Sequence, residues 1–90
     1  MKGKIVQKKR VTFSFWAPEA KEVFLTGDFN DWDPKSMPMR RDLKGTWKRQ
    51  VTLKKGSYQY KYLIDGQWVH DPKRETIQNA FGTLNNLIQV

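Results

Sequence analysis

The 90-residue sequence contains no cysteine, a single histidine and no long apolar stretch. Without cysteine, the chain can form neither a disulfide scaffold nor a cysteine-ligated zinc or redox site. No apolar run approaches the ~20 residues that span a bilayer, and the opening MKGKIVQKKR lacks the apolar core of a secretory signal. These absences predict a soluble, cytoplasmic protein without a membrane segment, a metal or another cofactor.

Helical periodicity is also nearly absent, and apolar residues alternate with polar ones as they do in half-buried strands. The Asp65-Gly66 pair is the strongest hairpin signal, because both turn positions favour a positive φ. A loop is expected from His70 to about Gly82, and a weak edge strand near Met37–Met39. The alternation predicts strands over residues 11–15, 21–26, 47–53, 58–64, 67–69 and 86–90.

Six or seven short strands separated by turn residues predict a single all-β domain, an immunoglobulin-like antiparallel β-sandwich. An OB-type barrel is the alternative fold. On the strand over residues 58–64, Tyr60 and Tyr62 share one face, while Gln59 and Lys61 share the other.

The chain is basic, with 17 Lys+Arg against 9 Asp+Glu and a formal net charge of +8. Five of these cations lie within residues 1–10, and others flank turns. This distribution indicates a solvated basic N-terminal segment plus scattered loop charges, which favours a role in solubility over a nucleic-acid footprint. We expect residues 1–10 to be disordered or loosely paired.

Few residues could carry catalysis or bind a metal. His70 is the only imidazole and is interpreted as a loop residue, so no nucleophile has a suitable base and no enzyme active site is predicted. Asp28, Asp31 and Asp33 share one loop, but the distal Glu of a calcium loop is missing. Turn chemistry explains these aspartates, so neither catalytic nor metal-binding residues are predicted.

The four tryptophans differ in their context. Trp47 alternates with apolar residues of its strand and is predicted to lie in the core, and Trp16 is predicted to cap the core at a strand end. Trp32 lies in the polar loop GDFNDWDP, and Trp68 lies on a hairpin arm. These last two are candidates for display at the surface.

Two displayed indoles near neutral polar residues suit a sugar. The C–H face of a pyranose packs on an indole, and its hydroxyl groups need donors and acceptors. The polar candidates are Gln59, Lys61, Thr83 and Asn85. Aromatic and basic residues together also suit single-stranded nucleic acid, so composition leaves both ligands open.

Longer motifs resemble a known family. The segment VTFSFWAPEAKEVFLTGDFNDWDP resembles the N-terminal accessory module of glycogen branching and debranching enzymes. GSYQYKYLIDGQWVHDP and FGTLNNLIQV resemble the glycogen-binding domain of the β subunit of AMP-activated protein kinase. Both belong to carbohydrate-binding module family 48, and the resemblance extends over residues 11–90. It implies an early-set immunoglobulin-like sandwich that binds α-1,4-linked glucan.

The resemblance also implies roles for individual residues. Trp32 and Trp68 match the tryptophans that stack on glucose, and Lys61 matches the lysine that bonds the sugar. Thr83 and Asn85 match polar contacts in a Gly-Thr-x-Asn-Asn segment. Phe81 stands where the kinase-type domain commonly has a leucine that protrudes into the curved glucan, and phenylalanine is bulkier and flatter.

Two functions from different classes stay open. The first is a non-catalytic module over residues 11–90 that binds glycogen, starch or maltooligosaccharide, with a kinase or a glycogen-metabolising enzyme as protein partner. The alternative is a regulatory or scaffold domain that binds a protein or nucleic acid through its basic surface. Because the chain begins with Met and ends on a predicted strand, it is expected to hold a complete module without a catalytic domain.

Overall fold

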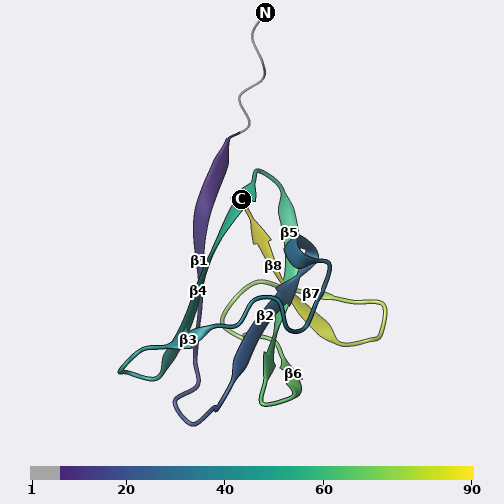
Figure 1. The fold of residues 1–90 in the computed structure, drawn as a ribbon. Coiled ribbons are helices and arrows are strands. Elements are labelled where there is room, and N and C mark those ends of the chain that lie inside the picture. The colour runs from purple at the N-terminus through teal and green to yellow at the C-terminus, as the bar shows by residue number, and fades with distance from the viewer. Residues whose placement is uncertain (1–6) are drawn as a thin grey trace, which may run out of the picture.

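A computed structural model describes residues 7–90 and shows two antiparallel sheets packed against each other (Figure 1). The smaller sheet has the order β1–β4–β3, and the larger follows β2–β5–β8–β7 with β6 also paired to β5. The smaller sheet contains β1 (Lys8–Trp16), β3 (Arg40–Arg41) and β4 (Thr46–Lys54). The larger contains β2 (Val23–Gly27), β5 (Ser57–Ile64), β6 (Gln67–Val69), β7 (Thr76–Gln78) and β8 (Leu84–Gln89). A short 3-10 helix, η1 (Asp28–Asn30), follows β2.

The predicted all-β, immunoglobulin-like sandwich is confirmed. The barrel alternative is wrong, because the two sheets share no strand within residues 7–90. No helix in this part of the chain is long and apolar enough to cross a membrane.

Alternation along the strands places large aromatic rings between the sheets. The rings of Phe13 and Tyr60 meet edge to face at 4.9 Å between centroids, and Tyr60 meets Tyr62 at 5.9 Å. Phe13, Tyr60 and Tyr62 are all buried, and such ring pairs contribute about 0.5–1.5 kcal/mol beyond their buried area. Burial raises the pKa of the Tyr60 and Tyr62 phenols above the ordinary value, so both stay neutral in the core.

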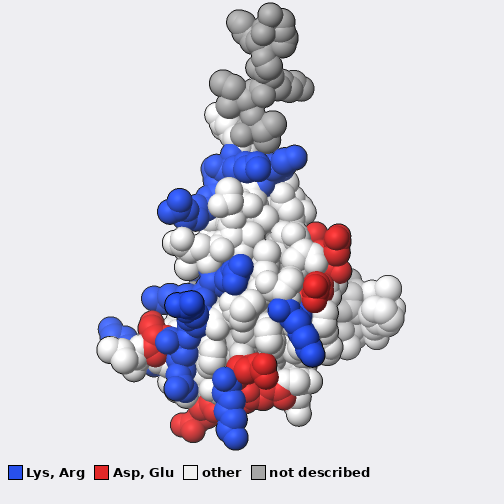
Figure 2. All heavy atoms as spheres, in the orientation of Figure 1, with Lys and Arg blue, Asp and Glu red and all other residues white. Residues whose placement is uncertain are grey.

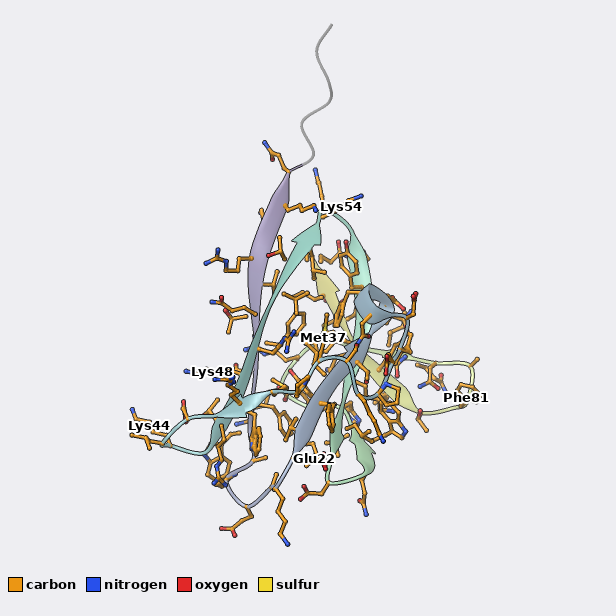
Figure 3. The ribbon with its side chains drawn as sticks, viewed as in Figure 1. Glu22, Met37, Lys44, Lys48, Lys54 and Phe81 are labelled. Atoms are coloured by element: carbon orange, nitrogen blue, oxygen red, sulfur yellow. The ribbon has the colours of Figure 1, made fainter. Side chains whose placement is uncertain are left out.

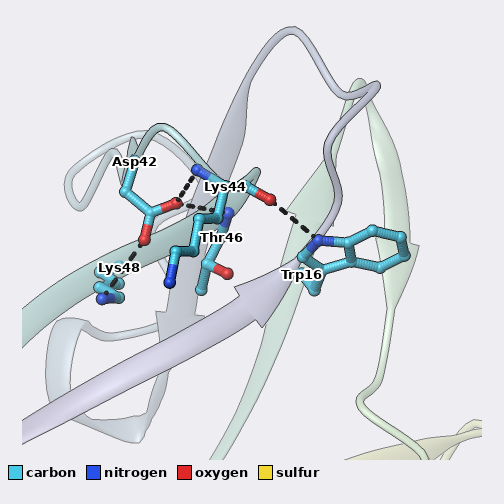
Figure 4. A network of polar contacts seen from close by, with 5 residues as sticks. All are labelled: Trp16, Asp42, Lys44, Thr46 and Lys48. Atoms are coloured by element: carbon cyan, nitrogen blue, oxygen red, sulfur yellow. Dashed lines mark hydrogen bonds and ion pairs between the residues drawn. The ribbon is translucent and has the colours of Figure 1, made fainter.

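The two tryptophans of the smaller sheet differ in burial. Trp47 is buried, and its Nε1–H donates to the Ala17 carbonyl at 2.8 Å, which confirms its core position. Trp16 is 68% exposed, so the prediction that it caps the core is wrong. Its Nε1–H donates to the Lys44 carbonyl at 3.1 Å, and this contact holds the ring at the surface (Figure 4).

Strand β1 begins earlier than the alternation predicts. The last three residues of the basic segment are paired rather than loose: Lys8, Lys9 and Arg10 lie opposite Lys54, Leu53 and Thr52. The expectation of disorder for residues 1–6 lies outside the described part of the chain.

Other differences concern short elements. Strands β3 and β7 were not predicted, and β7 lies within the segment expected to be a loop. The weak edge strand near Met39 is an isolated bridge between Phe24 and Pro38. Two backbone hydrogen bonds flank it, from Leu25 to Met37 at 2.9 Å and from Met39 to Val23 at 2.8 Å.

The turn between β3 and β4 depends on one carboxylate. Oδ1 of Asp42 accepts hydrogen bonds from the backbone amides of Lys44 at 2.8 Å and Thr46 at 3.0 Å. Oδ2 pairs with Nζ of Lys48 at 3.4 Å (Figure 4). The bond from Thr46 is the main cause that lowers the pKa of Asp42 below its ordinary value of 3.8, and Lys44 and Lys48 add to it.

We expect Trp47→Ala to lower the free energy of unfolding by about 3–5 kcal/mol, because it leaves a large cavity in the core. Trp16→Ala is the matched control and should cost no more than about 1.5 kcal/mol, the worth of its single hydrogen bond. Chemical denaturation of both variants measures the difference. Equal losses would contradict the burial of one indole and the exposure of the other.

We expect Asp42→Asn to melt below the parent protein at neutral pH. Because folding lowers the pKa of Asp42, its charged form stabilises the fold above the ordinary pKa, and this stabilisation is lost as the pH falls through the lowered value. The gap between the two melting temperatures should therefore shrink in strong acid. A gap that stays constant with pH would show that the charge contributes nothing.

Candidate functional site

A cleft of about 620 Å³ lies on the side of the larger sheet that points away from the core. It brings together all six residues to which the family resemblance gives a role: Trp32, Lys61, Trp68, Phe81, Thr83 and Asn85. Asp28, Gln59 and Asn79 complete its lining.

The loop after β2 fixes Trp32 through several contacts. Gly27 lies so close to β5 that an added Cβ would come within 2.6 Å of the Gln59 carbonyl oxygen. Phe29 of η1 anchors the loop to the core, with its ring 5.4 Å from that of Phe13. Trp32 itself has a φ of 58°, a conformation that costs a bulky residue about 1–3 kcal/mol and is often found at functional sites.

Asp28 joins this loop to strand β5. Its Oδ1 accepts a hydrogen bond from Nε1–H of Trp32 at 2.9 Å, and its Oδ2 accepts one from the backbone N–H of Gln59 at 2.7 Å. The prediction that turn chemistry explains the aspartates of this loop holds for Asp31, which has a φ of 54°, and for Asp33, which accepts from the Lys35 amide at 2.9 Å. Asp28 instead orients the indole.

The β5–β6 hairpin presents Trp68, which is 49% exposed and lies opposite Leu63. Asp65 and Gly66 have φ values of 47° and 82°, as the Asp-Gly signal predicts. Oδ1 of Asp65 also accepts hydrogen bonds from the backbone amides of Lys21 and Glu22, both at 2.9 Å. These bonds tie the hairpin to the chain before β2 and so set the position of its indole.

The loop between β7 and β8 displays Phe81, which is 90% exposed and stands at the loop tip (Figure 3). Asn79 holds this loop with all four of its hydrogen-bonding positions. Its Oδ1 accepts the amides of Phe81 at 2.9 Å and Thr83 at 3.1 Å. Its Nδ2 donates to Oγ1 of Thr83 at 2.7 Å and to Oδ1 of Asn85 at 3.0 Å.

This network extends to strand β5. Nζ of Lys61 donates to Oγ1 of Thr83 at 3.3 Å, and Nδ2 of Asn85 donates to Oε1 of Gln59 at 3.1 Å. Lys61 and Asn85 are each only 8% exposed. The polar floor of the cleft is therefore a connected set of side chains rather than independent surface groups.

The charges of the cleft balance. Among the described residues, Lys61 and Asp28 are the only charged ones in its lining. The rest of the lining consists of aromatic rings, amides and one hydroxyl. Such a surface suits an uncharged ligand with hydroxyl groups, because bringing a polyanion against Asp28 is unfavourable.

Sequence reasoning missed two members of the site. Asp28 was interpreted as a turn residue only, and Asn79 was not singled out. The available signal for Asn79 was turn chemistry, because an asparagine in a loop often accepts from the backbone amide two residues on, as Asn79 does from Phe81 at 2.9 Å. Gln59 was a candidate polar partner, and the cleft includes it.

Comparison with known proteins gives a family match over residues 10–90, to the model described as the glycogen recognition site of AMP-activated protein kinase. The chain is 40% identical over 87 residues to 5'-AMP-activated protein kinase subunit beta-2 of Mus musculus and of Homo sapiens. It is 41% identical over 81 residues to subunit beta-1 of Sus scrofa.

These matches cover nearly all of this chain but only part of each relative. They cover 97% of the chain and 31% of either beta-2 subunit, and 90% of the chain and 64% of the Sus scrofa sequence. The chain thus spans about a third of the length of the beta-2 subunits that it resembles.

We expect Asn79→Ala to loosen the loop that carries Phe81. The amide protons of Phe81 and Thr83 lose their acceptor, so they should exchange with solvent at least about fivefold faster, for a bond worth about 1 kcal/mol. Hydrogen exchange followed by NMR measures this. Gln78→Ala, on the exposed neighbouring residue, is the control, and equal exchange rates in the two variants would contradict the role of Asn79.

Proposed function

The chain belongs to the family of glycogen recognition domains of AMP-activated protein kinase, and we propose that the cleft on its larger sheet binds α-1,4-linked glucan. As a member of this family, the chain is a non-catalytic, glycogen-binding module with an all-β fold. One observation carries the proposal for the site: a single cleft combines two indoles, a projecting phenyl ring and a connected set of polar side chains.

The indoles of Trp32 and Trp68 supply the stacking surfaces. The C–H face of a glucose ring packs against an indole much as an aromatic ring does. The bond from Trp32 to Asp28 holds the first ring in place, and the tight hairpin holds the second. Because both rings are positioned without ligand, binding loses little side-chain entropy.

The polar floor supplies hydrogen bonds to the glucose hydroxyls. Oγ1 of Thr83 already accepts two bonds, so its own hydrogen points away from these donors and is left to bond a glucose hydroxyl. Lys61 has three N–H groups, and Thr83 takes one of them. Asn85 and Gln59 are fixed by their mutual bond, which sets the direction of their remaining amide groups.

Phe81 favours a curved ligand over a flat one. Its ring projects from the loop between β7 and β8 and is 90% exposed (Figure 3). An α-1,4 glucan winds around such a projection, whereas the flat ribbon of cellulose would be lifted from the indoles by it. We therefore assign glycogen, starch and maltooligosaccharides as the ligands.

The composition of the cleft argues against glycosidic cleavage and against nucleic acid. Cleavage needs a pair of carboxylic acids that flank the bond, and within residues 7–90 the cleft contains only Asp28, whose two oxygens already hold Trp32 and Gln59. A nucleic-acid groove needs several cations along the phosphates, and Lys61 is the only cation among the described residues that line this cleft.

The context of the module follows from its relatives. The beta subunits that it resembles are parts of a kinase by their names, and they are longer than this chain. We propose that the module works in the cytoplasm, where it brings a kinase or a glycogen-metabolising enzyme to its polysaccharide.

The test is native electrophoresis through gels that contain glycogen, together with titrations of β-cyclodextrin. We expect glycogen and soluble starch to retard the parent chain, and cellulose not to bind it. The chain should release no reducing ends from maltodextrin. Trp32→Ala and Trp68→Ala should each weaken binding roughly fivefold to a hundredfold, for stacking worth about 1–3 kcal/mol. Lys61→Ala should cost less, about 1–2 kcal/mol for one hydrogen bond.

Controls separate the site from the fold. Trp16→Ala removes an exposed indole outside the cleft and should leave glycogen affinity unchanged. Binding should also hardly change with salt, because the ligand is neutral. Unretarded migration of the parent chain would overturn the ligand, and retention of full affinity in both cleft tryptophan variants would overturn the site.

A further inference from the structure

The charges of this protein are segregated by sheet. The strands of the smaller sheet contain eight of the 17 lysines and arginines and none of the nine acidic residues. The strands of the larger sheet contain one charged residue, Lys61. The expectation of a basic segment plus scattered loop charges is therefore incomplete, because pairing of β1, β3 and β4 gathers distant cations into one layer.

Register shows which of these cations face away from the core. Phe13, Trp47 and Val51 point inward, so the residues one position along each strand point outward. Figure 2 shows lysines and arginines along the side of the molecule where Figure 1 places β1 and β4. We call the outward set the basic face; it consists of Lys8, Arg10, Arg40, Lys48 and Lys54, all exposed.

Two cross-strand pairs on the basic face join like charges. Lys8 lies directly opposite Lys54, and Arg40 lies directly opposite Lys48. Such pairs destabilise a sheet. Within residues 7–90, Lys48 alone among the five forms a salt bridge, to Asp42 at 3.4 Å. The fold thus tolerates unneutralised positive charge that does not help it to form.

The cations form two groups at opposite ends of the face. Lys8, Arg10 and Lys54 make the first group, and Arg40 and Lys48 make the second. Lys48 lies opposite Ser14, four residues beyond Arg10 on β1, which corresponds to about 14 Å at 3.4 Å per residue. The row between them carries the neutral side chains of Thr12 and Gln50, and the neutral Thr52 lies opposite Arg10.

We infer that the basic face is a docking surface for an acidic protein segment, with carboxylates that pair with both cationic groups. A segment with two acidic clusters matches the spacing of the groups, and its peptide bonds can use the hydroxyl and amide side chains between them. The segment would also relieve the repulsion within the Lys8–Lys54 and Arg40–Lys48 pairs.

Other polyanions fit this surface less well. A duplex carries one charge per ~1.7 Å of its axis, which calls for a continuous stripe rather than two separated groups. Single-stranded nucleic acid needs aromatic rings among the cations, and within the part of this face that the structure describes the only aromatic side chain is Trp16, at one end. A lipid surface has no fixed spacing that two separated groups could match.

The inference goes beyond glucan binding and does not depend on it. The cleft lies on the larger sheet and the basic face on the smaller one, with the core between them. No residue of the basic face lines the cleft. One molecule can therefore hold a glucan and an acidic segment at the same time.

The test uses the full chain and a fluorescent peptide of glutamate and threonine, titrated by anisotropy at low salt. The double variant Arg40→Glu with Lys54→Glu reverses one cation in each group and turns both like-charge pairs into attractive ones. We expect at least about tenfold weaker peptide binding, because repulsion replaces attraction, with an unchanged or higher melting temperature and unchanged glycogen retardation. If these two cations only stabilised the fold, peptide affinity would not fall while the melting temperature and the glycogen retardation are maintained.

The matched control is Lys35→Glu with Lys73→Glu, which makes the same change in net charge at exposed sites outside the basic face. It should bind the peptide as the parent does. The inference is overturned if the peptide does not bind, or if the control loses as much affinity as the basic-face variant. It is also overturned if oligothymidylate or phosphatidylserine vesicles bind more tightly than the peptide at the same salt.

Discussion

Strand β5 imposes the constraint on which both the core and the cleft depend. Its alternation buries Tyr60 and Tyr62 between the sheets and turns Gln59 and Lys61 toward the opposite side. A shift of the strand by one residue would exchange these two sets. Pairing with β2, β6 and β8 fixes the register, so the aromatic packing that stabilises the sandwich also determines where the polar floor lies.

The loops around the cleft owe their order to side chains that satisfy backbone groups. Asn79 holds the β7–β8 loop, and Asp28 ties the Trp32 loop to β5. Asn86, which is fully buried, exchanges hydrogen bonds with the Asp71 backbone at 2.7 and 2.9 Å and so fixes the segment after β6. A ligand thus meets a surface whose shape is already set, which reduces the entropy lost on binding.

Sequence patterns predicted the features that depend on neighbours along the chain. Alternation located the long strands, and Asp65-Gly66 located a hairpin whose φ values match the prediction. Family resemblance supplied six of the nine residues that line the cleft in the described part of the chain.

Features that depend on distant neighbours were missed or wrong. Trp16 was expected to cap the core. Its Nε1–H instead donates to the carbonyl of Lys44, 28 residues along the chain, and the ring is exposed. Strand β3 has only two residues, too few for a periodic signal. The two like-charge pairs could not be foreseen either, because they arise only when β1, β3 and β4 pair in their observed register.

The cleft and the basic face lie on opposite sides of the sandwich. This arrangement has a consequence for a whole polysaccharide particle. Under the proposed binding mode, a glucan particle that holds many copies would be covered by chains whose smaller sheets face the solution. A neutral colloid would then acquire a positive shell, with a formal charge of +8 from each chain. Coated particles would repel one another within a few Debye lengths, each ~8 Å at physiological salt, and so stay dispersed.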